Sequence, residues 1–168
     1  GNSWTREEAN RPPILDVGPP GAWDDGQIYS ASAPVRNGDE LWQYYSGCNL
    51  EHGASLTGMV CSIGLAKAKY NRLASLTGSG VIHTGEIAPK GPYLHLNYDG
   101  SQGEVLVELI KNGQVIPGFE KQNCIPLTGD SLDQVVRWTT QVSLPQGSFQ
   151  IKFYINSSSL FAFSTQAR

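Results

Sequence analysis

Five aromatic and polar residues in the N-terminal part of the chain have side chains that could contact a sugar or transfer a proton. Trp23, Asp24 and Asp25 directly precede a strand-like run, and Glu51 and His52 lie in a loop further along. An indole offers a flat apolar face, carboxylates accept hydrogen bonds, and an imidazole titrates near neutral pH. We therefore treat these five as the candidate carbohydrate-binding residues.

The same residues also have structural interpretations. Asp24 and Asp25 lie between glycines, where an aspartate commonly accepts backbone hydrogen bonds and holds a turn. His52 precedes Gly53 in a polar loop, where a solvated imidazole is typical. We favour the structural role for each residue and keep the sugar contact as a hypothesis.

No complete catalytic constellation is visible in the sequence. No serine lies in a G-x-S-x-G context, and no glycine-rich phosphate loop precedes a helical pattern. The three cysteines, Cys48, Cys61 and Cys124, lack the close pairing of a zinc knuckle. The sequence therefore predicts no catalytic residue, no cofactor and no metal site.

Charge and hydropathy argue against several classes of partner. The net charge of −3, without a cluster of Lys and Arg, is unlike that of a nucleic-acid-binding protein. No apolar run approaches the length of a membrane span, and no signal peptide is recognisable. Because the sequence opens at Gly1 without a methionine, a signal or domain can lie upstream. The compartment is therefore left open, and both secretion and a periplasmic location are compatible with the sequence.

Two of the cysteines flank a predicted hairpin loop. Cys48 and Cys61 can form a disulfide in an oxidising compartment, or they can be two small buried thiols. The sequence leaves both interpretations open.

The first part of the chain predicts an antiparallel meander after an extended lead-in over residues 1–20. Apolar and aromatic β-formers occupy residues 27–35, 40–46 and 60–68, and residues 73–76 are expected to add a short fourth strand. We assign residues 1–75 to this region.

Residues 76–168 predict an antiparallel β-sandwich of jelly-roll type. Short strand-like runs are separated by glycine and proline, and Asn112-Gly113 is a strong hairpin turn signal. The expected strands are residues 93–98, 104–110, 115–116, 135–139, 149–155 and 160–163. The chain as a whole is therefore expected to be all-β.

The longest irregular connection, residues 116–131, is expected to fold back over one end of the sandwich. Its prolines and glycines prevent it from joining a strand ladder, yet it is rich in apolar residues. We expect Phe119, Cys124, Ile125 and Leu127 to be buried, and Asp130 to accept backbone hydrogen bonds from the same loop.

A succession of motifs supports a family resemblance. The motifs are Ile63-Gly64-Leu65-Ala66, Tyr93-Leu94-His95-Leu96-Asn97-Tyr98-Asp99, Ile116-Pro117-Gly118-Phe119, Cys124-Ile125-Pro126-Leu127-Thr128-Gly129-Asp130-Ser131 and Phe161-Ala162-Phe163. Together they resemble the C-terminal β-sandwich module of large bacterial proteins related to five-bladed-propeller glycoside hydrolases. Upstream, Gly21-Ala22-Trp23-Asp24-Asp25-Gly26 and Glu51-His52-Gly53 are similar to the last propeller blade of the same proteins.

The resemblance implies a fragment without an active site of its own. In those glycosidases the acidic catalytic residues come from several blades, and only one blade is visible here. Glycoside hydrolysis ordinarily needs two carboxyl groups about 5 to 10 Å apart, which neighbouring blades would have to position. The missing upstream blades are therefore expected partners.

Three functional hypotheses follow. The first is a non-catalytic accessory module of a glycoside-hydrolase-like protein that binds carbohydrate. The second is a propeller fragment that contributes Asp24, Asp25 and His52 to an active site. The third is a structural domain that self-associates through exposed sheet edges.

Overall fold

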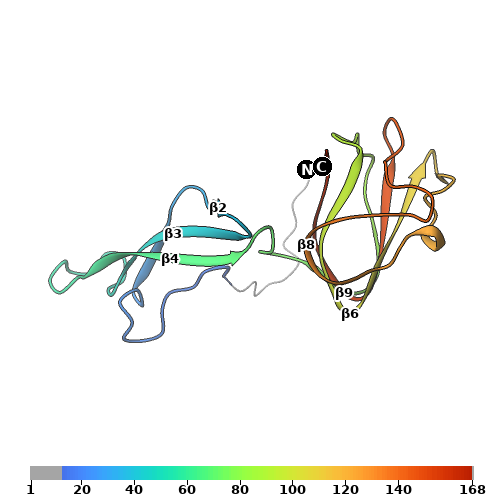
Figure 1. The fold of residues 1–168 in the computed structure, drawn as a ribbon. Coiled ribbons are helices and arrows are strands. Elements are labelled where there is room, and N and C mark those ends of the chain that lie inside the picture. The colour runs from blue at the N-terminus through green and yellow to red at the C-terminus, as the bar shows by residue number, and fades with distance from the viewer. Residues whose placement is uncertain (1–12, 168) are drawn as a thin grey trace. The chain divides into compact units, whose positions relative to one another are not determined.

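The computed structural model describes residues 13–167, and the chain divides into two compact units after Lys69. Each unit contains one antiparallel sheet (Figure 1), and the described residues include no α-helix, only one 3-10 turn, η1 (Lys121–Asn123). The expected all-β antiparallel fold is confirmed. Within residues 13–167 no helix has the length and apolar character that a membrane span requires.

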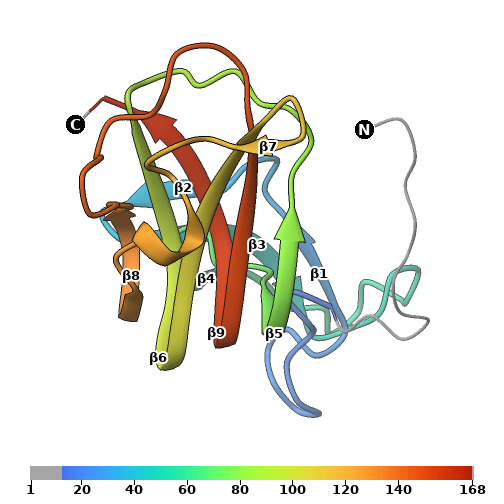
Figure 2. The same cartoon turned by 90° about the vertical axis from the view of Figure 1, so that its right-hand side faces the viewer.

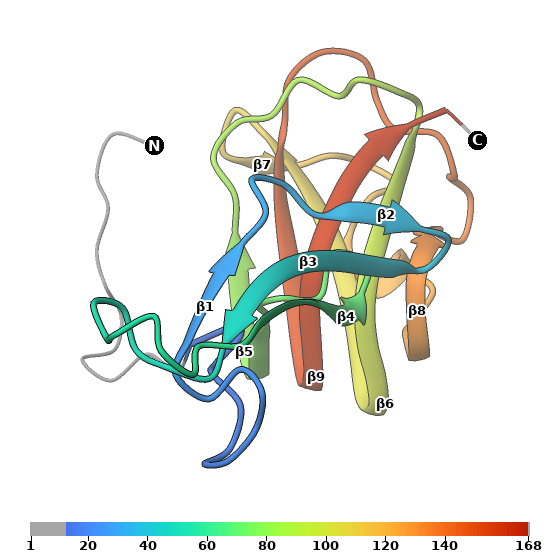
Figure 3. The ribbon, with the colours of Figure 1, turned by 90° about the vertical axis from the view of Figure 1, so that its left-hand side faces the viewer.

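The sheet of the first unit is built around one central strand. Strand β3 (Glu40–Cys48) pairs with β4 (Cys61–Lys69) along one side, and with β1 (Gln27–Ser30) and β2 (Val35–Asn37) along the other (Figure 3). The predicted strand over residues 27–35 is thus two short strands. The break covers residues 31–34 and ends at Pro34, which has no N–H to donate to a ladder.

The predicted fourth strand of the meander belongs to the second unit. Strand β5 (Leu76–His83) pairs with β9 (Gln150–Gln166), so residues 73–76 add nothing to the first sheet. The second sheet also contains β6 (Tyr93–Lys111), β7 (Gln114–Val115) and β8 (Leu127–Val135). Its order is β5-β9-β6-β7, with β8 beside β6 (Figure 2).

The core of the second unit forms because its central strands bend. Two pairs of predicted strands, residues 93–98 with 104–110 and 149–155 with 160–163, are in fact the continuous strands β6 and β9. The register between them shifts between Asp99 and Glu104. In Figure 1 both strands can be followed through the bend. One curled sheet therefore supplies the two facing layers that a sandwich needs.

The side-chain alternation of β6 changes at this bend. Before it the inward residues are Leu94, Leu96 and Tyr98, and after it they are the odd-numbered Val105, Val107 and Leu109. All of them join one hydrophobic cluster. Without the shift one limb of the strand would present its polar side to the core, because a one-residue change in register exchanges the two faces of a strand.

Strand β9 changes its alternation in the same way. Ile151, Phe153 and Ile155 are buried before the bend, and Ser158 and Leu160 after it. Ser157 takes a φ of 45°, a left-handed conformation that a non-glycine residue seldom adopts. The bend thus places the apolar residues of both limbs around the same core.

The connection over residues 116–131 is shorter than the sequence indicates, because Leu127 to Ser131 belong to β8. Phe119, Cys124 and Leu127 are buried as expected, whereas Ile125 is wrongly predicted and remains 50% exposed. Ile125 lies next to Pro126 on the outside of a backbone bridge to Arg137, so its side chain points away from the core that Cys124 enters.

Trp138 is the residue on which this connection packs. Its ring lies edge-on to Phe119, with centroids 4.9 Å apart, and its Nε1–H donates to the Val107 carbonyl at 3.1 Å. The Val107 N–H in turn donates to Cys124 Sγ at 3.3 Å. The indole and thiol are therefore satisfied inside the core.

We expect Phe119→Ala to lower the free energy of unfolding of the second unit by about 3–5 kcal/mol, because it leaves a cavity beside Trp138. Ile125→Ala, a matched truncation in the same segment, should change it by less than about 1 kcal/mol because the side chain is half exposed. Urea unfolding followed by tryptophan fluorescence measures both. Equal losses for the two variants would contradict the packing described here.

A buried arginine joins the start of the second unit to its sheet. The Arg72 side chain is 7% exposed, its Nε–H donates to Asn97 Oδ1 at 2.7 Å, and Nη2 donates to the carbonyls of Tyr98 and Ser131. The guanidinium also lies 4.5 Å from the centre of the Phe161 ring. This segment is thereby tied to β6, β8 and β9.

Asp130 completes this arrangement. Its carboxylate accepts a hydrogen bond from the Arg72 guanidinium, which lies 58 residues earlier in the chain. This partner was not expected from the sequence, and the backbone donors of its own loop stay a prediction. The buried charge of the pair is the Arg72 guanidinium, and Asp130 supplies the opposite charge that a buried ion needs.

Replacing Arg72 by Met should lower the free energy of unfolding of the second unit by about 2–4 kcal/mol, since buried carbonyl and amide oxygens lose their donor. The exposed Lys90 provides the control, because Lys90→Met removes a cation outside this network and should have an effect below about 0.5 kcal/mol. Chemical denaturation of the two variants makes the comparison, and an Arg72→Met variant as stable as the parent would refute the anchoring role.

Candidate functional site

The first sheet has two chemically different faces. Directly paired residues share a face, so Tyr29, Ser46 and Ile63 lie on one side and Ile28, Gly47 and Ser62 on the other. We define the aromatic face by its large side chains, namely Tyr29, Val35, Trp42, Tyr44, Ile63 and Leu65. We define the glycine face by Tyr45, Gly47 and Gly64.

Trp23 packs on the glycine face. Its ring stacks on Tyr45 with centroids 5.8 Å apart, and a Cβ on Gly47 would come within 2.8 Å of the indole. A Cβ on Gly64 would lie 2.3 Å from the Tyr45 ring. The two glycines therefore let the aromatic rings lie flat against the strands.

Asp24 and Asp25 have hydrogen-bond partners within the chain. Asp24 is buried, and its Oδ2 accepts the Tyr45 hydroxyl at 2.8 Å, a bond that together with burial raises the pKa of the Tyr45 phenol. Asp25 Oδ2 accepts the Gly21 N–H at 2.6 Å across a turn. Asp25 thus holds a turn through a backbone hydrogen bond as the sequence favoured, whereas Asp24 accepts a side-chain hydroxyl from strand β3.

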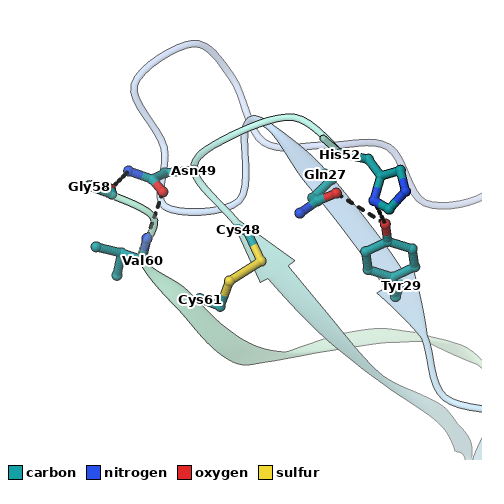
Figure 4. Close-up of a disulfide and its surroundings, with 8 residues drawn as sticks. All are labelled: Gln27, Tyr29, Cys48, Asn49, His52, Gly58, Val60 and Cys61. Atoms are coloured by element: carbon teal, nitrogen blue, oxygen red, sulfur yellow. Dashed lines mark hydrogen bonds between the residues drawn. A yellow bond between two sulfur atoms is a disulfide. The ribbon is translucent and has the colours of Figure 1, made fainter. Parts of the chain in front are cut away.

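Glu51 and His52 lie in a loop closed by a disulfide between Cys48 and Cys61, which face each other on β3 and β4 (Figure 4). Asn49 stiffens the loop base, since its Oδ1 accepts the Val60 N–H and its Nδ2 donates to the Gly58 carbonyl. The Glu51 carbonyl accepts the Ala54 N–H, which forms a turn around His52. The disulfide interpretation of the two cysteines therefore holds in the structure.

The loop places His52 against the aromatic face. Its Nδ1 lies 3.0 Å from the Tyr29 hydroxyl, which also lies 3.1 Å from Gln27 Oε1 (Figure 4). Because Tyr29 and Tyr45 project from opposite faces, the sheet separates His52 from Trp23 and Asp24. The five candidate residues do not converge on one site.

The aromatic face carries a row of rings that the candidate set did not include. Tyr29 is 52% exposed and Tyr44 42% exposed, while Trp42 is half-buried between Lys67 and the sheet. The alternation in the sequence already placed Trp42 and Tyr44 on one side. Tyr29 could not be added from sequence, because its position depends on the register of β1 against β3.

The end of this row at Trp42 is charged. Trp42 Nε1–H donates to Glu40 Oε2 at 2.7 Å, and the Lys67 ammonium lies 4.4 Å above the indole and 3.5 Å from the same carboxylate. The hydrogen bond from Trp42, helped by the Lys67 charge, lowers the pKa of the Glu40 carboxyl. An ionised carboxylate and an ammonium are therefore available beside the rings.

The free cysteine among the described residues, Cys124, lies in the core of the second unit. Burial raises the pKa of the Cys124 thiol to about 11, which leaves it protonated and a poor nucleophile at neutral pH. Among residues 13–167, no three His, Cys, Asp or Glu side chains are placed to hold a metal ion. Comparison with family models, curated proteins and solved structures found no match to this chain.

The disulfide is expected to stabilise the first unit by about 3 kcal/mol, because it closes a loop with a sequence separation of 13 residues and so restricts the unfolded chain. The double variant Cys48→Ser, Cys61→Ser should therefore unfold at a lower temperature. Calorimetry with and without a reducing agent tests this. The parent protein should shift on reduction and the double variant should not; a parent melting temperature indifferent to reductant would contradict the disulfide.

Proposed function

We propose that this chain is a non-catalytic module that binds carbohydrate through the aromatic face of its first unit. The observation that carries the proposal is the row of Tyr29, Tyr44 and Trp42 on one exposed side of the sheet. Aromatic rings that are open to solvent on one side suit the apolar face of a pyranose, and soluble domains seldom expose several of them together without a ligand.

The dimensions of the row favour an extended ligand. Trp42 and Tyr44 are two residues apart on β3, which separates them by about 7 Å. Tyr29 pairs with Ser46, the next position of β3 on the same face. Polar groups stand at both ends, Gln27 and His52 at one and Glu40 at the other. Several sugar units of one chain can contact rings and polar groups at the same time.

The state of the carboxylates supports binding without hydrolysis. Asp24 is buried under Tyr45, and Asp25 is engaged in a turn, so neither stands opposite a second carboxylate across an accessible bond. Together with the sequence resemblance, this favours an accessory module of a larger glycoside-hydrolase-like protein. The alternative of a fragment contributing Asp24, Asp25 and His52 to one active site is disfavoured, because Asp24 and His52 contact tyrosines that project from opposite faces of the sheet.

Self-association is a second candidate function, and the aliphatic side chains of the same face favour it. Val35, Ile63 and Leu65 are 54%, 77% and 38% exposed. Strand β4 pairs only with β3 among the described strands, so its outer edge is open to another strand. Sedimentation velocity of the parent and of Ile63→Lys decides whether this face joins two copies.

We expect Tyr44→Ala and Trp42→Ala each to weaken binding to a polysaccharide identified by glycan-array screening at least tenfold, which corresponds to about 1.4 kcal/mol. The loss follows from removal of a stacking surface. Isothermal titration measures the affinities, and Trp23→Phe, a change on the glycine face, serves as the control.

Three results would count against the proposal. The first is that the parent chain binds no glycan. The second is that Tyr44→Ala and Trp42→Ala both leave the affinity for the glycan unchanged. The third is that only Trp23→Phe lowers this affinity. Hydrolysis of the bound glycan that is abolished by Asp24→Asn would instead favour the active-site alternative.

A further inference from the structure

A pocket of about 230 Å³ opens in the second unit, within the segment that the sequence marks as its longest irregular connection. Ile125, Pro126 and Leu127 line one side of it, and Gln134, Val135 and Arg137 line the other. The proposed carbohydrate-binding face does not involve these residues. The pocket therefore raises a separate question of function.

The backbone holds the two sides of the pocket in place. Strand β8 follows the bent β6, pairing from Val105 with Leu127 to His95 with Val135. The segments beyond its two ends then meet, since the Ile125 N–H donates to the Arg137 carbonyl at 2.8 Å and Cys124 bridges Trp138. A pocket closed by main-chain hydrogen bonds needs little rearrangement to accept a ligand.

The pocket lining combines apolar and polar residues. Ile125, Pro126, Leu127 and Val135 are the apolar part, and Tyr98, Thr128 and Gln134 are uncharged polar residues. The Tyr98 hydroxyl donates to the Thr128 carbonyl at 2.9 Å, and burial raises the pKa of this phenol, which keeps it neutral. Ile125 is half exposed, so its side chain is available to a ligand. No acidic side chain lines the pocket.

Arg137 gives the pocket its one charge. Its side chain is exposed and makes no hydrogen bond or ion pair with any other residue in the described part of the chain. Its guanidinium N–H donors are therefore open to a ligand that can accept hydrogen bonds. The electrostatic preference is therefore for an anion.

We propose that this pocket binds a small monocarboxylate with a short apolar body. The guanidinium of Arg137 takes the carboxylate through paired N–H donors, and the apolar body lies against Ile125, Pro126 and Leu127. The volume of about 230 Å³ is below the roughly 300–1,000 Å³ of sites for drug-sized ligands. A single cation in the lining disfavours polyphosphates as ligands. The lack of acidic side chains in the lining disfavours metal ions.

Butyrate and its neutral isostere butanamide test the proposal on the full chain, through amide chemical shifts measured by NMR. Butyrate should produce saturable shifts confined to residues 125–137 and their neighbours on β6. Butanamide should bind at least tenfold more weakly because it lacks the charge. Arg137→Gln should weaken butyrate binding at least tenfold without changing the melting temperature, whereas Lys90→Gln, an equal loss of charge elsewhere in the unit, should leave the affinity unchanged.

Several outcomes would overturn the site. If butyrate and butanamide bind with equal affinity, Arg137 does not recognise the carboxylate. If Arg137→Gln and Lys90→Gln weaken butyrate binding equally, the effect comes from the net charge of the protein and not from this pocket. Shifts located away from residues 125–137 would place the ligand elsewhere. Tighter binding of glucuronate than of butyrate would replace the apolar acid by an acidic sugar. None of these results bears on glycan binding by the aromatic face, which Trp42→Ala and Tyr44→Ala test separately.

Discussion

The second unit depends on one constraint, which is that its two long strands must change side-chain alternation where they bend. Val105 and Val107 reach the same core as Leu94 and Leu96 only because the register shifts between them. A curled sheet that kept a single alternation would bury the polar side chains of one limb, at a cost that no neighbouring packing offsets. Strand β8 follows the bent β6, and the segments beyond its two ends meet where Cys124 bridges Trp138, beside the pocket that Arg137 lines.

Among residues 13–167 the hydrophobic core cluster begins at Leu94, so the described part of the first unit is held together by other means. Its glycine face admits flat aromatic rings, its disulfide closes the longest loop, and the Asp24–Tyr45 hydrogen bond satisfies a buried carboxylate. The opposite face keeps its apolar and aromatic side chains in solvent. A single-layer sheet with one solvent-exposed apolar face can bind a ligand or another protein surface on that face. This is the physical basis for proposing that the aromatic face is a binding site.

The two proposed sites use different chemistry because their surroundings differ. The aromatic face is open, flat and bordered by polar groups, which suits an extended neutral polymer. The pocket in the second unit is small, has both apolar and polar lining residues, and carries one guanidinium that has no carboxylate partner among residues 13–167, which suits a small anion. Neither site contains a reactive nucleophile, and the thiol of Cys124 is protected by its burial in the core.

The sequence by itself determined the features that depend on neighbouring residues. The all-β class follows from short alternating runs, the turn at Asn112-Gly113 from two residues that adopt positive φ, and the shared side of Trp42 and Tyr44 from their spacing. Only the tertiary structure decided the features that depend on pairing between distant segments. These are the continuity of β6 and β9, the exposure of Ile125, the partnership of Arg72 with Asp130, and the separation of His52 from Trp23. The physical reason is that alternation specifies which residues share a side within one strand, whereas register and bending specify which strands and sides meet.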